Sequence, residues 1–298
     1  GAKDEPSSPE LNKIGQMRIR DATCDDVARL KMLLPKALAL DFDPEPVVEE
    51  KLFGPGYGGA ARCRVALVED SVRGVAVACG SALRVMAVEP SFRRRGLGSA
   101  LLDDVVRQSG PSLKRIIVGA AAGNYVVPGI PSDHHESIEF FRKRGFRETV
   151  RTTDMKVAVG DVSRPEPMVD VEINRVETFD GPLERFLSSE FGESIAWEIG
   201  HGLSRGRAVV RTATSDGAIA GFTACEINNA GIGTFGPQGV TPASRGKGLG
   251  SLLLRHSLAD LRELGYLEAR IPWVSAVDYY ERSCGATVAG TYVVMRRG

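Results

Sequence analysis

The chain has 298 residues, of which 43% are hydrophobic and 26% are charged, proportions that are typical of a globular protein. Its 38 basic residues balance its 38 acidic residues, which argues against nucleic-acid binding through an overall positive charge, and no apolar run is long enough to span a membrane. The five cysteines are scattered without C-x-x-C spacing, which argues against a disulfide framework or a metal site and favours a reducing, cytoplasmic location.

The first half of the chain is expected to form one domain over residues 17–160, after a polar stretch, 1–16, that we interpret as a tag or disordered tail. Strand-like runs occupy 17–20, 62–68, 74–79, 83–88 and 114–118, and helix-like segments occupy 21–40, 46–52, 96–108 and 134–144. A long loop, 119–133, separates the last of these strands from the last helix. Two further strands are expected to close this half.

The second half, residues 169–298, repeats this order after a proline-containing segment, 161–168, that is predicted to be a linker. Strands are expected at 169–176, 207–212, 218–227, 232–240, 267–271 and 286–296, and helices at 182–202, 248–264 and 275–284. The first half is about 12 residues longer after its motif helix, mostly in the loop 119–133, and loops of this length usually bind a ligand or contact a neighbouring domain. The pattern predicts two α/β (α+β) domains, each a mixed, mostly antiparallel sheet flanked by helices.

One strand–loop–helix motif occurs in both halves, with Val240 standing 152 positions after Val88. After each valine the pattern R-x-x-G-x-G-S leads into a helix, whose first backbone amides lack partners and attract anions. Glycine lets a phosphate approach the backbone, and basic side chains add charge-assisted hydrogen bonds. The repeat predicts two phosphate-binding loops, formed by Val88, Arg93, Arg94, Arg95, Gly96, Leu97, Gly98 and Ser99 and by Val240, Arg245, Gly246, Lys247, Gly248, Leu249, Gly250 and Ser251.

This motif, strand-Val-x-Pro-x-x-R-x-x-G-x-G-S-x-L-L, resembles the acyl-coenzyme A site of the GNAT superfamily of N-acetyltransferases. The resemblance covers nearly all of residues 17–298 as two tandem domains. It implies acetyl-CoA as the cofactor, with the coenzyme A pyrophosphate on the loop amides and the pantetheine arm along the strands that end at Val88 and Val240. It also implies a small-molecule amine as the acceptor.

The resemblance further implies a tyrosine on the later helix, in the pattern aromatic-Tyr-x-x-x-Gly, that donates a proton to the leaving thiolate. The second half has Tyr279 and Tyr280 there, with one residue more than the pattern before Gly285, whereas the first half has Phe141. Phenylalanine cannot donate a proton, so we expect the second half to be catalytic, with Tyr280 as the acid and Tyr279 in reserve. Glu226, at a strand end, is the candidate base for the amine.

Short segments around Phe235, Trp273 and Pro128–Pro131 resemble tandem bacterial enzymes of the glucosamine N-acetyltransferase type. This resemblance implies an amino sugar or a related small polar metabolite as the acceptor. Glu190 and Glu193 are the candidate residues for attracting its ammonium group. A mycothiol-synthase-like enzyme, an aminoglycoside acetyltransferase and a non-catalytic acyl-CoA-binding sensor remain alternatives, and the protein is expected to be a monomer or homodimer.

Overall fold

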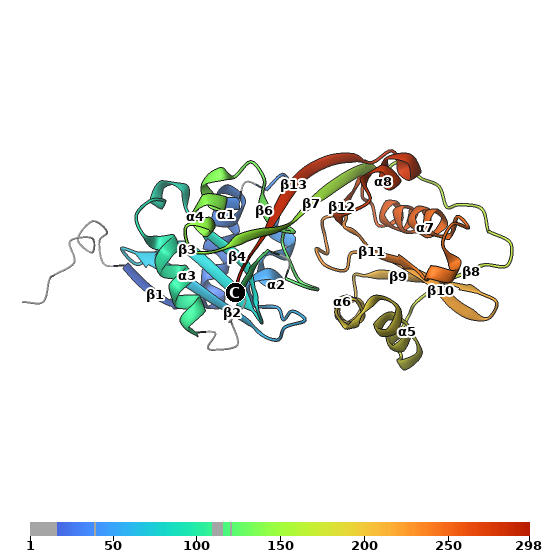
Figure 1. Cartoon of the computed structure of the whole chain (residues 1–298), viewed down its shortest axis with the longest axis horizontal. Coiled ribbons are helices and arrows are strands. Elements are labelled where there is room, and N and C mark those ends of the chain that lie inside the picture. The colour runs from blue at the N-terminus through green and yellow to red at the C-terminus, as the bar shows by residue number, and fades with distance from the viewer. Residues whose placement is uncertain (1–16, 39, 109–115, 120) are drawn as a thin grey trace, which may run out of the picture.

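The computed structural model describes residues 17–38, 40–108, 116–119 and 121–298, which fold into two lobes (Figure 1). The predicted tail 1–16 and the first two residues of the strand predicted at 114–118 lie outside the described residues. Within the part of the chain that the structure describes, no helix is long and apolar enough to cross a membrane.

The first half follows the predicted order up to its last helix. Its strands are β1 (Met17–Asp21), β2 (Ala61–Val68), β3 (Ser71–Cys79), β4 (Ala82–Val88), β5 (Ile116–Val118), β6 (Ile130–Pro131) and β7 (Arg147–Ala158). Its α-helices are α1 (Val27–Leu38), α2 (Val48–Phe53), α3 (Leu97–Gln108) and α4 (His135–Arg142). Helix α3 forms where the apolar residues recur at helical spacing, and that face is buried.

The second half has the same order of elements. Its strands are β8 (Glu172–Arg175), β9 (Val209–Ser215), β10 (Ala218–Cys225), β11 (Phe235–Val240), β12 (Glu268–Val274) and β13 (Thr287–Arg297). Its helices are α5 (Gly181–Phe191), α6 (Glu193–Ser204), α7 (Leu249–Glu263) and α8 (Val277–Cys284). The single helix predicted over 182–202 is therefore wrong. Helix α5 ends at Gly192, which has φ of +97°, a backbone conformation that residues with a side chain rarely adopt. The chain turns at this glycine before α6 begins.

The closing strands differ most from the prediction. Two closing strands were expected in the first half and closing strands over 286–296 in the second, but each half contains a single long strand after its last helix, β7 in the first and β13 in the second. The two strands arch together from one lobe to the other, and β13 ends in the first lobe (Figure 1). Each half thus obtains its missing strand from the other half.

The pairing register defines this exchange. One nine-stranded sheet runs in the order β1-β2-β3-β4-β5-β13-β7-β12, with β6 also paired to β13, and a second sheet runs β11-β10-β9-β8. Strand β13 inserts between β5 and β7, where Met295 pairs with Val118 of the first half. Strand β7 in turn pairs with β12 of the second half, where Ala269 pairs with Val157. The predicted linker, 161–168, contains no helix or strand, yet the sheet continues across this boundary between the halves.

Helices cover both faces of the sheet in each half. In β2, Val65 and Leu67 pack with α1 and α2, whereas Ala66 and Val68 pack with α3 and α4. This alternation follows from the two-residue period of a strand, and it requires apolar residues at successive positions of a central strand. Val293 of β13 is fully buried in the same core as α3 and α4, so the end of the chain is part of the core of the first half.

We predict that Val293→Asp unfolds both halves together. The substitution buries an unpaired carboxylate and should lower the free energy of unfolding by about 3 kcal/mol or more. Both tryptophans, Trp197 and Trp273, lie in the second half, so their fluorescence reports that half while far-UV circular dichroism reports the whole chain.

The control is Val288→Asp, because Val288 lies on the same strand and is 50% exposed. The expected result is a large fall in Tm for Val293→Asp by both probes and little change for the control. A tryptophan transition that stays at the wild-type temperature in Val293→Asp would show that the second half folds without the shared strands.

Candidate functional site

A cavity of about 550 Å³ lies where β11 and β12 separate. The two strands share a single bridge, Thr234 to Arg270, and then diverge. Pro237 has no N–H to donate to a neighbouring strand, which suits an edge beside an open space. The lining comes from both halves of the chain: Phe235–Gln238, Ile271–Ala276, Tyr279, Tyr280, Ser194, Ile195, Glu198, Asn228, Thr234 and Arg296, together with Ile117, Ala122, Gly123 and Tyr125 of the first half.

The long loop of the first half, 119–133, forms part of this wall, as its extra length suggested. The backbone N–H of Tyr125 donates to Asn228 Oδ1 at 3.1 Å, and Asn228 Nδ2 donates to the Tyr125 carbonyl at 3.1 Å. The Tyr125 ring meets Trp273 edge to face, with ring centroids 5.6 Å apart. Gly123 lies so close to Trp197 that a Cβ atom there would be 2.5 Å from the indole ring. The loop is therefore fixed against the second half.

The two predicted phosphate loops have matching conformations. In each, a 3₁₀ turn (Pro90–Phe92 or Pro242–Ser244) precedes exposed basic residues, and a glycine with positive φ, Gly96 at +89° or Gly248 at +82°, starts the helix. Helix α7 has no side-chain cap, and a Cβ atom on Gly248 would meet only Met168, at 3.4 Å. The first amides of α7 are thus accessible to an anion from solvent.

The remaining residues predicted to bind the cofactor take different positions. Val88 and Val240 end β4 and β11, and Leu97 and Leu249 are buried in the first turns of their helices. Arg93–Arg95 and Arg245–Lys247 are exposed on the turns, and Gly98, Ser99, Gly250 and Ser251 belong to the first helical turns. The Nε atoms of Arg93 and Arg245 donate back to the carbonyls of Val88 and Val240, at 3.4 and 3.3 Å, so these two side chains also brace their own loops.

The surroundings of the two helix starts differ. A Cβ atom on Gly98 would lie 3.5 Å from the ring of Phe140, whereas one on Gly250 would lie 3.2 Å from the hydroxyl of Tyr279. Tyr279 therefore corresponds in space to Phe140, not to Phe141. In the first half the Arg144 guanidinium also stacks on Phe140 and contacts the Ser99 hydroxyl, which covers that helix start.

Both predicted tyrosines line the cavity, but their hydroxyl groups differ. The Tyr279 hydroxyl is buried and has no hydrogen-bond partner among the described residues. Tyr280 packs edge to face on Phe235, and burial, with smaller effects of Tyr279 and Cys284, raises the pKa of Tyr280 to about 12. A buried hydroxyl without a partner costs free energy unless a ligand satisfies it. The structure thus favours Tyr279 over Tyr280 as the group that meets a ligand.

Glu226 lies outside the cavity lining. It is 2% exposed, has φ of +58°, and accepts hydrogen bonds from Thr234 N at 2.8 Å, Tyr266 Oη at 2.7 Å and Gly231 N. These donors hold the loop between β10 and β11. The structure gives this carboxylate a role in loop folding, and its position does not support the predicted role as a base.

The predicted acidic residues for the acceptor are near the cavity but do not line it. Glu190 and Glu193 are exposed at the junction of α5 and α6. Glu198, one turn further along α6, is the carboxylate that reaches the cavity. Burial raises the pKa of Glu198 to about 7, and the charge of Lys51 opposes this shift. Glu198 was overlooked, although an acidic residue beside Ile195 and Ile199 on an apolar helix face was a signal.

The corresponding region of the first half is filled. Arg84 of β4 stands 152 positions before Gly236 of β11, so a guanidinium replaces a glycine. Arg84 is 4% exposed and donates to the carbonyls of Gly54 at 2.7 Å and Lys51 at 3.2 Å. Burial lowers its pKa, so this guanidinium is held in a poorly solvated place. The two halves therefore share the conformation of the predicted phosphate loop and differ in the space next to it.

The sequence profile of the acetyltransferase (GNAT) family matches residues 173–286, and that of the acetyltransferase (GNAT) domain matches residues 59–148. Together the two matches cover more than half of the chain, and each stops near the start of the shared strand of its half. No curated protein matches the sequence significantly.

Solved structures with the same fold include other tandem proteins. The glucosamine N-acetyltransferase region of a fungal multi-domain GH3 β-N-acetylglucosaminidase has a TM-score of 0.79 and 17% identity, over 96% of this chain but only 38% of that one. A tandem GNAT protein from the clavulanic acid biosynthesis pathway has a TM-score of 0.69 and 16% identity, over 94% and 98%. A GNAT protein from Sphaerobacter thermophilus has a TM-score of 0.67 and 18% identity, over 94% and 95%. At these identities the similarity is one of fold.

The role of Glu226 in loop folding leads to a stability prediction. In Glu226→Gln an amide NH₂ replaces one acceptor oxygen and faces N–H and O–H donors, which should cost about 1–3 kcal/mol and lower Tm. The matched control is Glu172→Gln at the exposed start of β8. Equal Tm values for the two variants in differential scanning calorimetry would contradict the assignment.

Proposed function

This chain belongs to the GNAT acetyltransferase family and contains two such domains in tandem, and from this premise we propose that its second domain acetylates the primary amine of a small polar acceptor. The observation that carries the proposal is the buried, unpartnered hydroxyl of Tyr279 beside the start of the phosphate-loop helix α7. A proton donor, a phosphate loop and a cavity thus meet at one place.

Acetyl-CoA, the usual donor of this family, supplies an activated thioester when bound. The residues present fit this group, because the uncapped start of α7 can hold a pyrophosphate and Gly248 leaves room beside the backbone. Arg245 and Lys247 are exposed next to those amides and add positive charge. Gln238, whose Nε2 donates to the Gly250 carbonyl at 3.1 Å, has an unpartnered Oε1 that can accept a hydrogen bond from an amide N–H.

In the proposed reaction the acceptor amine attacks the thioester directly in a ternary complex. Tyr279 donates the proton that the leaving sulfur needs, because a positioned phenol can act as a general acid toward a thiolate. The apolar rings of Tyr280, Phe235 and Trp273 limit water in the cavity. Exclusion of water strengthens a hydrogen bond between the Tyr279 hydroxyl and a bound ligand.

We propose that the first domain does not turn over. Phe140 replaces the tyrosine, Arg144 covers the helix start, and Arg84 fills the space that corresponds to the cavity. Its contribution to the reaction is the loop that closes the cavity of the second domain.

The finer proposal is that the acceptor is an amino sugar or an amino-sugar-containing metabolite. It is supported by the fold shared with a glucosamine N-acetyltransferase region and by the mixed lining of the cavity. Tyr125 and Trp273 offer apolar faces, while Asn228 and Glu198 offer polar groups for an amine and hydroxyl groups. A thiol-release screen of amino sugars, aminoglycosides and amino acids tests this proposal. If no amine releases thiol while CoA still raises Tm, the protein is an acyl-CoA-binding sensor.

The proton-donor assignment predicts unequal effects of two conservative substitutions. Tyr279→Phe should lower kcat by about 100-fold or more, the usual size of a lost general acid, with little change in the KM for acetyl-CoA. Tyr280→Phe is the matched control, since its ring packs on Phe235, and it should retain most of kcat. The reverse order of effects in steady-state kinetics would return the role to Tyr280.

The one-active-domain proposal predicts unequal effects of two matched glycine substitutions. Gly248→Asp and Gly96→Asp each place a negative charge and a strained side chain at the start of a phosphate-loop helix. Gly248→Asp should raise the KM for acetyl-CoA about tenfold or more, which corresponds to about 1.4 kcal/mol, whereas Gly96→Asp should leave turnover nearly unchanged. Equal loss of turnover in both variants would contradict the proposal.

A further inference from the structure

We infer that Glu198 is the acceptor-side catalytic residue, which binds the ammonium group of the acceptor and takes its proton, and that Lys51 of the first domain is its positioning residue. This inference rests on the proposed function and assigns its missing base. It also narrows the acceptor to primary amines that are protonated near neutral pH.

The carboxylate in the cavity wall offers a partner for a cationic acceptor. Among the described residues that line the cavity, Glu198 carries the one carboxylate and Arg296 the one guanidinium. Glu198 is 8% exposed, and Tyr279 lines the same cavity. An ammonium group that moves from water to the buried side of this cavity needs a carboxylate partner, because a buried unpaired charge is costly.

Lys51 provides the second line of evidence. This residue is fully buried at the contact between the domains, and its Nζ lies 2.7 Å from Asn124 Oδ1, 2.6 Å from the Asn228 carbonyl and 3.1 Å from Asn228 Oδ1. Both amide orientations are fixed independently, since Asn124 Nδ2 donates to Pro55 O and Asn228 Nδ2 donates to Tyr125 O. All three contacts are therefore acceptors. Three acceptors require three N–H donors, and only the ammonium form of Lys51 has three. Burial lowers the pKa of Lys51, but the hydrogen-bond geometry fits the charged form.

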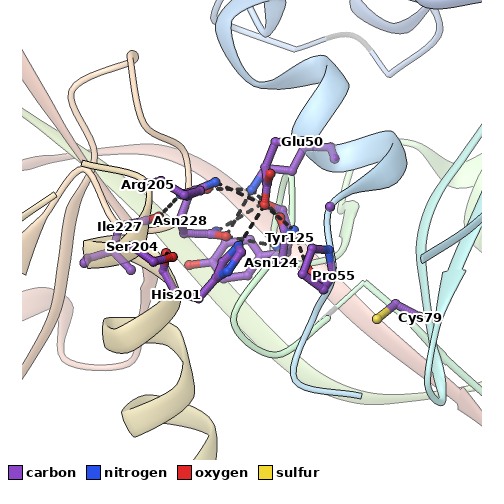
Figure 2. Close-up of polar contacts among 12 residues, drawn as sticks. Glu50, Pro55, Cys79, Asn124, Tyr125, His201, Ser204, Arg205, Ile227 and Asn228 are labelled. Atoms are coloured by element: carbon purple, nitrogen blue, oxygen red, sulfur yellow. Dashed lines mark hydrogen bonds and ion pairs between the residues drawn. The ribbon is translucent and has the colours of Figure 1, made fainter. Parts of the chain in front are cut away.

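A buried ammonium ion needs a counter-charge, and the carboxylates of Glu50 and Glu198 both favour the charged form of Lys51. Figure 2 shows the neighbouring carboxylate, Glu50, already engaged by Arg205 at 3.1 Å and His201 at 3.0 Å. Lys51 is the charged group whose field favours the ionised form of Glu198. The same three hydrogen bonds of Lys51 tie Asn124 to Asn228, so one side chain holds the cavity wall and also favours the ionised form of Glu198.

The proton balance is complete with the groups named. The acceptor nitrogen loses one proton to Glu198 before it attacks, its bond to the acetyl carbon forms, and the carbon–sulfur bond breaks. The second proton of the nitrogen replaces the one that Tyr279 gives to the sulfur. Glu198 then releases its proton to water when the product leaves. A carboxyl group with a pKa of about 7 is well matched to this exchange at neutral pH.

Other titratable groups face this region and must be separated from Glu198. They are Lys51 and Glu50 on α2, His201 on α6, Arg205 directly after α6, Arg84 on β4, Tyr125 on the long loop and Arg296 on β13. Asp154 of β7 also has a pKa raised to about 7 by burial, but it accepts a hydrogen bond from Trp273 N at 2.9 Å and does not line the cavity. A titration near pH 7 must therefore be assigned by substitution.

The test measures kcat/KM from pH 5.5 to 9 for two accepted amines whose own pKa values differ. For the wild type we expect the plot of kcat/KM against pH to have an acidic limb near pH 7 that is common to both amines. On this limb kcat/KM falls as pH decreases because Glu198 becomes protonated. Glu198→Gln should lower kcat/KM at pH 7 by about 100-fold or more and remove this limb, while calorimetric affinity for acetyl-CoA is unchanged. Asp154→Asn should keep the limb, and Glu184→Gln, exposed on α5, should keep both rate and limb.

Lys51→Met should move the limb to higher pH, because loss of the positive charge favours the protonated form of Glu198. The inference is overturned if kcat/KM of Glu198→Gln at pH 7 stays within about threefold of the wild type. It is also overturned if Asp154→Asn, and not Glu198→Gln, removes the fall in kcat/KM below pH 7. Either outcome leaves the proposed function standing. If the variants do not fold, a wild-type profile without a shared limb near pH 7 overturns it equally. Failure of every amine to release thiol from the wild type instead refutes the proposed function.

Discussion

The insertion of β13 between β5 and β7 is the constraint on which the rest of this structure depends. Without β13, the first sheet would end at β5 with a row of unpaired backbone groups, and without β7, β12 would lose the partner that completes the second half. Unpaired strand edges inside a core are costly, so neither half can close alone. The exchange also fixes how the halves face each other, and that arrangement brings residues 122–125 to the cavity of the second half.

Duplication followed by such an exchange allows the two domains to diverge in function. Both keep the loop in which a glycine with positive φ starts the helix, a feature that depends on backbone conformation more than on side chains. The space next to the loop depends on side chains. There Arg84 of the first domain stands where the second has Gly236, and Phe140, which Arg144 covers, lacks the hydroxyl of Tyr279. We propose that the first domain acts through Lys51 and its long loop. These shape the acceptor side of the site in the second domain, although the first domain does not itself carry out the reaction.

The sequence predicted local structure well and long-range structure less well. Helix α3 and the strands β2 to β4 followed from apolar periodicity, because a helix face and a buried strand impose different spacings. The exchange of β7 and β13 was not predictable, since a strand has the same pattern whichever sheet it joins. The extra residue before Gly285 hid the match of Tyr279 to Phe140, which is a relation in space. Glu190 and Glu193 were the right residue type in the right segment, but the break at Gly192 turns α6 so that Glu198 reaches the cavity instead.

The most direct test is a crystal structure of the full chain with coenzyme A. We expect the pyrophosphate to lie on the amides at the start of α7 and the thiol to lie in the cavity of about 550 Å³ beside the Tyr279 hydroxyl, under the wall formed by residues 122–125. A thiol beside Phe140 in the first domain, with the cavity of the second domain empty, would show that the second domain is not the active one.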